Sequence, residues 1–223
     1  MNSRKLVSMF FKTLFIGGLA GFVASFFVNW QDYSAYLSPF DGFNLLGVAL
    51  FYLGYALVFT VIAQTGFFAY LFIHRFGQGF FKTFWPVVQV LLMLFALFDM
   101  IFFTSDDISA LFKWSLVIII GMTAYIVATI KVKQTKKTAF IPTMFLMIVV
   151  SALELSLVLR AGDVKFIILM LVPVLVANAY QILILHKVTA VDPEHQARIE
   201  ARRKARREAK EKQAAEKRVK KKN

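Results

Sequence analysis

The sequence predicts an all-α, polytopic integral membrane protein with about six transmembrane helices and a basic cytoplasmic C-terminal helix. Three observations lead to this fold class. Hydrophobic residues make up 59% of the 223-residue chain and charged residues only 17%, which is more apolar surface than a water-soluble domain can hide. About six separate apolar stretches approach the length of about 20 residues that a helix needs to cross a bilayer. The cations are concentrated between and after these stretches.

Each apolar stretch is expected to be helical, because hydrocarbon offers no hydrogen-bond partner to an exposed peptide group. The first follows Arg4, Lys5 and Lys12, and we expect it to stay as an uncleaved helix because the small residues Ala24 and Ser25 lie inside the apolar run. The second is long enough to tilt or to extend out of the bilayer. The predicted spans are Thr13–Val28, Phe43–Phe72, Phe84–Phe103, Leu111–Ile130, Ala139–Leu159 and Val164–Leu185.

The distribution of Lys and Arg predicts that both termini are cytoplasmic. With the N-terminus inside, the inner segments hold 23 of the 26 cations, and the outer loops hold only Lys113, Arg160 and Lys165. This asymmetry follows the positive-inside rule. An even number of crossings also places the two termini on the same side. We therefore expect a multi-pass protein of the cell membrane whose short outer loops form no external domain.

The chain divides into a six-helix transmembrane domain, residues 1–187, and a highly charged tail, residues 188–223. Residues 186–223 hold 14 of the 26 Lys and Arg against six acids, a net charge of +8. Asp192, Pro193 and Glu194 form a typical helix start, and Glu residues then precede Lys or Arg by four positions. Because this segment has no apolar face, we expect a solvated helix that is attracted to anionic lipid headgroups and is not inserted.

No catalytic or metal-binding constellation is recognisable in the sequence. The chain has no Cys, which excludes disulfides and thiolate chemistry. Its three histidines, His74, His186 and His195, lie in predicted inner segments or in the tail, and the HExxH, GxSxG and Walker patterns are absent. We therefore expect no enzymatic activity, no metal, no cofactor and no nucleic-acid partner. The lipid bilayer is the partner that the composition requires.

Polar side chains inside the predicted spans are the first candidate functional residues. Asp99 and Glu154 each lie in the outer quarter of an outward-running helix, where they could share a proton, bind a cation or meet Arg160. In the structural alternative, Asp99 reaches the outer interface and Glu154 is either protonated or hydrogen-bonded to a neighbouring helix. Four amides at an inner level either join helices by hydrogen bonds or line a cavity open to the cytoplasm. These amides are Gln64, Gln89, Asn178 and Gln181.

The inner connection after the second span is the second candidate. It mixes cations, glycines and aromatic residues at the bilayer surface, which is typical of an interfacial anchor and equally of a docking turn for a membrane partner. The residues concerned are His74, Arg75, Phe76, Gly77, Gly79, Phe80 and Lys82.

Gly17, Gly21 and Ser25 form a stripe of small residues on the first predicted span. Small residues four positions apart lie on one helix face and let another helix approach closely. The stripe therefore predicts a packing surface, without indicating which helix occupies it.

Two segments resemble a known family: SRKLVSMFFKTLFIGG at residues 3–18 and FAYLFIHRFG at residues 68–77. They are similar to the KinB-signalling pathway activation proteins, the KbaA family of spore-forming Bacillus relatives, as is the hydropathy profile over about residues 1–190. These are six-span membrane proteins of similar size. The resemblance implies a positive regulator of a sensor histidine kinase that feeds the sporulation phosphorelay, and it implies no catalytic residues. A membrane sensor histidine kinase is then the expected partner, reached by helix–helix or inner-turn contact.

Two other functions stay open at the level of sequence. A small ion-coupled transporter would use Asp99 and Glu154 within a water-accessible cavity. A membrane insertion factor would combine the basic tail with an inward-open groove that holds a buried cation, and the sequence shows no such cation in the helix centres.

Overall fold

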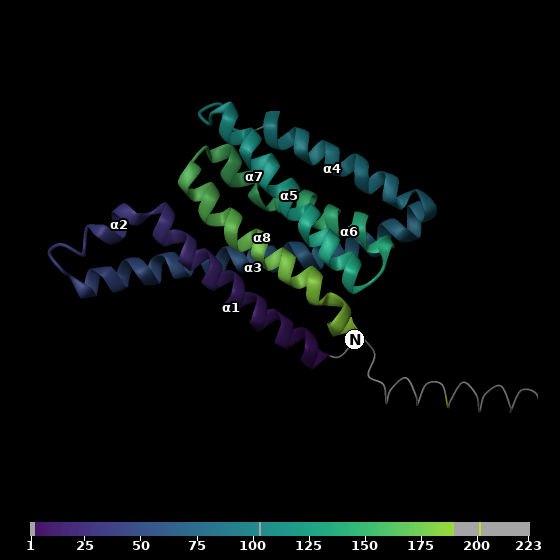
Figure 1. Ribbon diagram of the computed structural model, residues 1–223, viewed down its shortest axis with the longest axis horizontal. Coiled ribbons are helices and arrows are strands. Elements are labelled where there is room, and N and C mark those ends of the chain that lie inside the picture. Colours follow the sequence, from purple (N-terminus) through teal and green to yellow (C-terminus); the bar gives the residue numbers. More distant parts are fainter. Residues whose placement is uncertain (1–2, 103, 190–200, 202–223) are drawn as a thin grey trace, which may run out of the picture.

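A computed structural model describes residues 3–102, 104–189 and 201, and nearly all of them are helical. The predicted all-α class is confirmed for this part of the chain, which contains no strand. Figure 1 shows the helices as an elongated bundle. The helices are α1 (Ser3–Val28), α2 (Trp30–Ser34), α3 (Gly42–Phe81), α4 (Trp85–Phe102), α5 (Ala110–Gln134), α6 (Phe140–Phe145), α7 (Ser151–Ala161) and α8 (Val164–Thr189), with the short turns η1 (Lys82–Phe84), η2 (Lys137–Ala139) and η3 (Leu146–Val150) between them.

Five helical stretches in the described residues are long and apolar enough to cross a membrane. The longest, Gly42–Phe102, contains both α3 and α4. The chain reverses between them at Lys82, which has a φ of 47°, and α4 runs in the opposite direction to α3 (Figure 1). The other four stretches are Arg4–Val28, Ala110–Gln134, Lys137–Ala161 and Val164–Thr189. All six predicted spans therefore correspond to helical segments, while the number of crossings stays a prediction.

Helix α1 packs against α3 and α8 through its small residues. A Cβ added at Gly17 would lie 2.6 Å from the Thr60 side chain of α3, and one added at Gly21 would lie 3.1 Å from the Pro173 ring of α8. At the end of the same stripe, Ser25 hydrogen-bonds a tyrosine hydroxyl of α2 at 2.7 Å. The stripe therefore faces three different elements, and larger residues at the two glycines would separate these helices.

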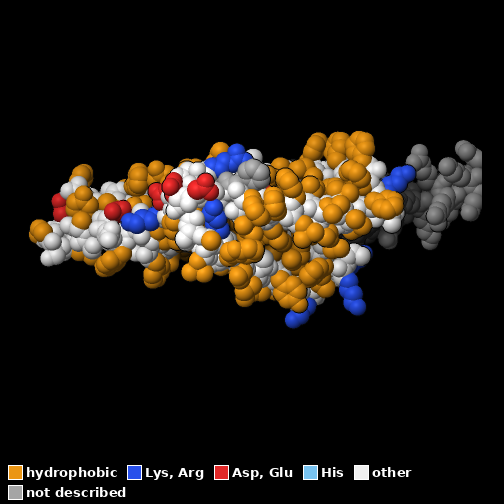
Figure 2. All heavy atoms as spheres, turned by 90° about the horizontal axis from the view of Figure 1, so that it is seen from above, with side chains coloured by type: hydrophobic (Ala, Val, Ile, Leu, Met, Phe, Trp, Pro, Cys, Tyr) orange, Lys and Arg blue, Asp and Glu red, His pale blue; other side chains and the backbone are white. Residues whose placement is uncertain are grey.

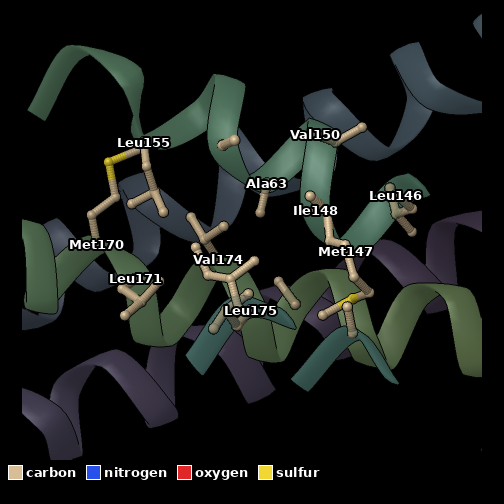
Figure 3. Close-up of a cluster of buried hydrophobic side chains, with 14 of the residues drawn as sticks. Ala63, Leu146, Met147, Ile148, Val150, Leu155, Met170, Leu171, Val174 and Leu175 are labelled. Carbon is tan, nitrogen blue, oxygen red and sulfur yellow. The ribbon is translucent and has the colours of Figure 1, made fainter. Parts of the chain in front are cut away.

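The apolar core lies where α8 meets α3 and the segment formed by η3 and α7 (Figure 3). Ala63 of α3, Leu155 of α7 and Val174 of α8 are completely buried there. The turn η3 is π-helical, and all five of its residues are buried. Because a π-helical turn holds more residues than an α-helical turn, it changes the register of the following helix. It directly precedes Ser151, the first residue of α7.

Large apolar side chains cover much of the outside of the bundle (Figure 2). Phe15 of α1, Leu50 of α3 and Phe95 of α4 are all more than half exposed, although each lies well inside its helix. Water-soluble proteins rarely expose so much contiguous apolar surface. On the face shown in Figure 2, the acidic side chains lie in the half of the molecule that contains α2. The bundle is therefore compatible with a membrane protein.

Several predicted boundaries are wrong. Helix α1 begins at Ser3, ahead of the predicted start at Thr13, because the cations before Thr13 are spaced among apolar residues. Helix α3 continues past Phe72 to Phe81, so most of the predicted inner connection is helical. The outer loop expected between the predicted spans Thr13–Val28 and Phe43–Phe72 contains the short helix α2. The tail, residues 188–223, lies outside the described residues except for 188, 189 and 201.

Candidate functional sites

Glu154 lies inside the bundle and is hydrogen-bonded to α8. Asn178 of α8 donates from Nδ2 to Glu154 Oε2 at 2.9 Å and to Ser151 Oγ at 3.1 Å. One amide thus joins two positions of α7 to α8. The sequence places the acids at an outer level of the bilayer and the amides at an inner level. This separation is wrong for Glu154 and Asn178, because the two side chains are in contact. Counting residues along one helix ignores tilt and the π-helical turn η3, and both change the depth of Glu154.

Helix α3 approaches Glu154 closely because Gly66 has no side chain. A Cβ at this position would lie 1.8 Å from Glu154 Oε1 and 2.9 Å from Val150 Cγ1. The Oε1 atom is buried and has no hydrogen-bond partner among the described residues. A buried carboxyl group with an unpaired oxygen is costly in hydrocarbon and is a functional candidate for that reason.

Asp99 is not part of this cluster. It lies on α4 and is partly exposed, and it makes no hydrogen bond or ion pair with a described residue. Glu154 likewise has no hydrogen bond to Arg160. The two acids therefore do not form a pair, and Glu154 has the hydrogen bond to a neighbouring helix that the structural alternative requires.

The buried amides differ in their partners. Gln89 of α4 places its Nε2 3.4 Å from His74 Nδ1 of α3 and so connects these two helices. Gln64 is 1% exposed and Gln181 is 0% exposed, but neither amide has a hydrogen-bond partner within the described chain. Buried amides without partners are rare in folded proteins. A bound water or another ligand would satisfy them.

The C-terminal end of α3 is held against α4 by His74. Trp85 of α4 donates from Nε1 to His74 Nδ1 at 3.1 Å, and the Tyr70 ring stacks on the imidazole with centroids 5.6 Å apart. Gly77 lies against the Trp85 ring, which an added Cβ would approach to 2.4 Å. This glycine therefore serves close packing, whereas the sequence pattern had suggested a turn. The turn itself is at Lys82.

An exposed row of aromatic side chains follows the outer surface of the same helix end. We call Phe72, Phe76 and Phe80 the α3 aromatic row; their side chains are 63%, 51% and 78% exposed. Consecutive rings lie 4.4 and 6.2 Å apart. Arg75 and Gly79 lie on the same exposed helix end, as does Lys82 directly after it. The predicted docking residues therefore divide into an inward set, His74 and Gly77, and an outward set.

Lys131 is a buried cation that sequence reasoning missed. It is in the last turn of α5 and only 5% exposed. Its Nζ donates to the Ile182 carbonyl of α8 at 2.5 Å and lies 3.3 Å from His186 Nδ1. The spacing of the buried residues Ile120, Ala124 and Ala128 on α5 puts Lys131 on the same face and could have predicted its burial.

A polar network joins α1, α2 and α3 at the opposite end of the bundle. Tyr52 of α3 hydrogen-bonds both Asn29 and Asp32, and Ser25 bonds Tyr33. Tyr33 is 2% exposed, and this burial raises the pKa of its phenol above the ordinary value. The network fixes the short helix α2 on the ends of its two neighbours. No group of three or more His, Asp or Glu that could hold a metal occurs within the described ranges.

Comparison with known proteins gives the family. A family model described as KinB-signalling pathway activation in sporulation (KbaA) matches residues 17–188. The chain belongs to this family. It is also 34% identical over 198 residues to the KinB-signaling pathway activation protein of Bacillus subtilis (strain 168), covering 85% of this chain and all of that protein. No solved structure matches. The family match includes Glu154, Asn178, Lys131 and the α3 aromatic row, and it ends at residue 188, where the basic tail begins.

Proposed function

We propose that this protein is a membrane-embedded, non-enzymatic positive regulator of a KinB-type sensor histidine kinase in a pathway leading to sporulation. The family match and the 34% identity to a KinB-signaling pathway activation protein support the pathway. The five long apolar helical stretches support the location in the membrane. The proposed topology has six crossings and cytoplasmic termini, with the basic tail near anionic headgroups of the inner leaflet.

The α3 aromatic row is the observation that supports a contact mechanism best. Its three phenylalanines are exposed, aligned on one helix face, and located where α3 ends and the chain reverses. Aromatic side chains are enriched at protein interfaces because they bury large areas with few rotatable bonds. Arg75 and Lys82 beside the row would pair with acids of a partner near the membrane surface. The kinase would therefore be contacted at the inner end of α3.

Paired substitutions on the same helix test this contact. Phe76→Ala with Phe80→Ala should strongly reduce KinB-dependent sporulation signalling, while the protein stays at its normal membrane level. Phe43→Ala, at the other end of α3 and 86% exposed, is the matched control and should leave signalling unchanged. A photoreactive residue at position 80 should crosslink to the kinase, and one at position 43 should not. Equal crosslinking from both positions would refute docking at the inner end.

An ion-coupled carrier is the second candidate function. The Glu154 oxygen and the Gln64 and Gln181 amides that have no partner among the described residues favour it, because such atoms could bind a proton or a cation. An insertion factor has less support. Lys131 is a buried cation, but it lies in the last turn of α5 and outside the helix centre.

A further inference from the structure

A cavity of about 500 Å³ opens between the inner ends of α3, α5, α6 and α8. Its size is within the range of small-molecule and lipid sites. One part of its wall is apolar and consists of Leu71, Pro142, Ile182 and Leu185. The remaining wall is polar, and the residues with charge or ring nitrogens are Lys131, Lys136, His74 and His186.

Within the part of the chain that the structure describes, the polar wall has cations and no acid. Among the described residues, neither Asp nor Glu lines the cavity, and the acceptors that meet the Lys131 ammonium are the Ile182 and Leu183 carbonyls and His186 Nδ1. A buried cation is costly unless a counter-charge compensates it. Lys136 adds a second positive charge on an exposed side chain. A bound anion would supply the missing negative charge.

Both histidines present a hydrogen-bond donor that is not used within the described chain. The indole N–H of Trp85 can only donate, so His74 Nδ1 accepts from it, and the proton of the neutral ring is then on Nε2. The Lys131 ammonium also only donates, so His186 Nδ1 accepts in the same way. The two Nε2–H groups have no partner in the described part of the chain. The Tyr70 hydroxyl, on a residue that is 3% exposed, has none either.

We propose that this cavity binds one anionic phospholipid, with its headgroup phosphate near Lys136, Lys131 and the two histidines. Phosphate oxygens accept charge-assisted hydrogen bonds from the Lys136 ammonium and from imidazole N–H groups. The three N–H groups of Lys131 already have acceptors, so Lys131 contributes its positive charge. The apolar wall accounts for the acyl part, because it continues from the polar wall and includes Leu71, Ile182 and Leu185. The site is separate from the tail, and the proposal does not depend on the kinase contact.

The test uses the full-length protein in nanodiscs, with native mass spectrometry and lipid titration as readouts. Phosphatidylglycerol should bind at one site and survive delipidation longer than phosphatidylcholine. Lys136→Gln should weaken phosphatidylglycerol binding about tenfold, as expected for the loss of one charge-assisted hydrogen bond. Lys137→Gln is the matched control: it removes the same charge from the adjacent residue, which does not line the cavity, and should bind like the wild type.

Four results would overturn the proposal. Equal binding of phosphatidylcholine would refute the need for an anion. Inorganic phosphate that binds at the same site as tightly as phosphatidylglycerol would refute the need for an acyl chain. Equal effects of Lys136→Gln and Lys137→Gln would refute the cavity. Loss of the bound lipid on deletion of residues 192–223 would place it on the tail. Thermal unfolding in detergent shows that each variant is folded; Lys136 is exposed, so its substitution should not disturb packing.

Discussion

At the scale of single residues, Glu154 is the side chain that separates a structural role from a carrier role. Its Oε2 accepts from Asn178, while its Oε1 is buried beside Gly66 and has no partner among the residues that the structure describes. A purely structural role needs only an acceptor for Asn178 Nδ2, which a glutamine side chain provides. A carrier role needs a group that binds and releases a proton, which glutamine cannot do.

We predict that Glu154→Gln retains signalling and a normal membrane level. Glu154→Leu, in contrast, removes the acceptor and leaves the buried Asn178 amide with one fewer partner, which should lower the free energy of unfolding by about 1–3 kcal/mol. Unfolding in detergent and a KinB-dependent sporulation reporter measure the two effects. A Glu154→Gln protein that is stable and inserted but inactive would favour the carrier function.

Asp41 provides a second prediction at this scale, outside the membrane-spanning segments. Its side chain accepts from the backbone N–H of Asn44 at 3.1 Å and caps the start of α3. The Asn44 side chain also donates to Asp41, from Nδ2 to Oδ2 at 2.7 Å, and the two hydrogen bonds together lower the pKa of Asp41 below its ordinary value. The cap therefore contributes stability above the ordinary pKa of Asp, about 3.9, and this contribution is lost as the pH falls through the folded-state pKa.

Asp41→Ala should accordingly increase amide exchange in the first turn of α3 at neutral pH. Asp41→Asn should leave exchange near the wild-type rate, because Asn is also a good N-cap. At neutral pH, the amides of this turn should be equally protected from exchange in the wild type and in Asp41→Asn. In acid, the wild type alone should lose protection. Hydrogen exchange with mass spectrometry detects both effects. Identical exchange in the Ala and Asn variants would show that the cap does not stabilise this turn.

At the scale of helices, the existence of the elements could be predicted but their contacts could not. The apolar stretches and the stripe of Gly17, Gly21 and Ser25 follow directly from hydropathy and spacing. Hydropathy does not specify which helices are neighbours, so the Asn178–Glu154 contact was not predicted. Gly77 shows the same limit: its residue type suggested a turn, although it lies within a helix and accommodates Trp85. Lys131 lies one residue beyond the predicted span Leu111–Ile130, and the count of charges takes no account of the buried face of α5.

The α3–α4 hairpin gives a prediction at this scale. Gly77→Ala should weaken it, because the new Cβ would lie 2.4 Å from the Trp85 ring, which must then move. We expect a loss of about 1–3 kcal/mol in the free energy of unfolding, as for other overpacked sites. Gly79→Ala is the matched control, since nothing lies within 4 Å of its added Cβ, and it should be neutral or slightly stabilising. Both variants make the same Gly-to-Ala change within α3, so equal destabilisation by both would show that the contact with Trp85 does not cause the loss.

At the scale of the whole molecule, the number of crossings determines where every surface lies. Residues 42–102 form one helical stretch that is interrupted by the reversal at Lys82. If this stretch crosses the membrane twice, the chain has six crossings and both termini are on one side. If α3 and α4 together make a single crossing, the count is five and the termini are on opposite sides. In that second topology, the cations that follow α5 and those of the tail would lie on a side opposite to Arg4 and Lys5.

We predict two crossings for this stretch and cytoplasmic termini. Helix α3 alone has 40 residues, about 60 Å at 1.5 Å per residue, which exceeds the hydrocarbon thickness of about 30 Å. The positive-inside rule also favours an inner location for Lys82 and Lys137. Topology reporters fused after Lys82, after Lys137 and at the C-terminus should therefore read cytoplasmic, and reporters near Asp41, Asp107 and Asp163 should read external. A cytoplasmic N-terminus with an external C-terminus would establish an odd number of crossings. An external reporter after Lys82 would place the α3 aromatic row on the side opposite to the expected kinase contact.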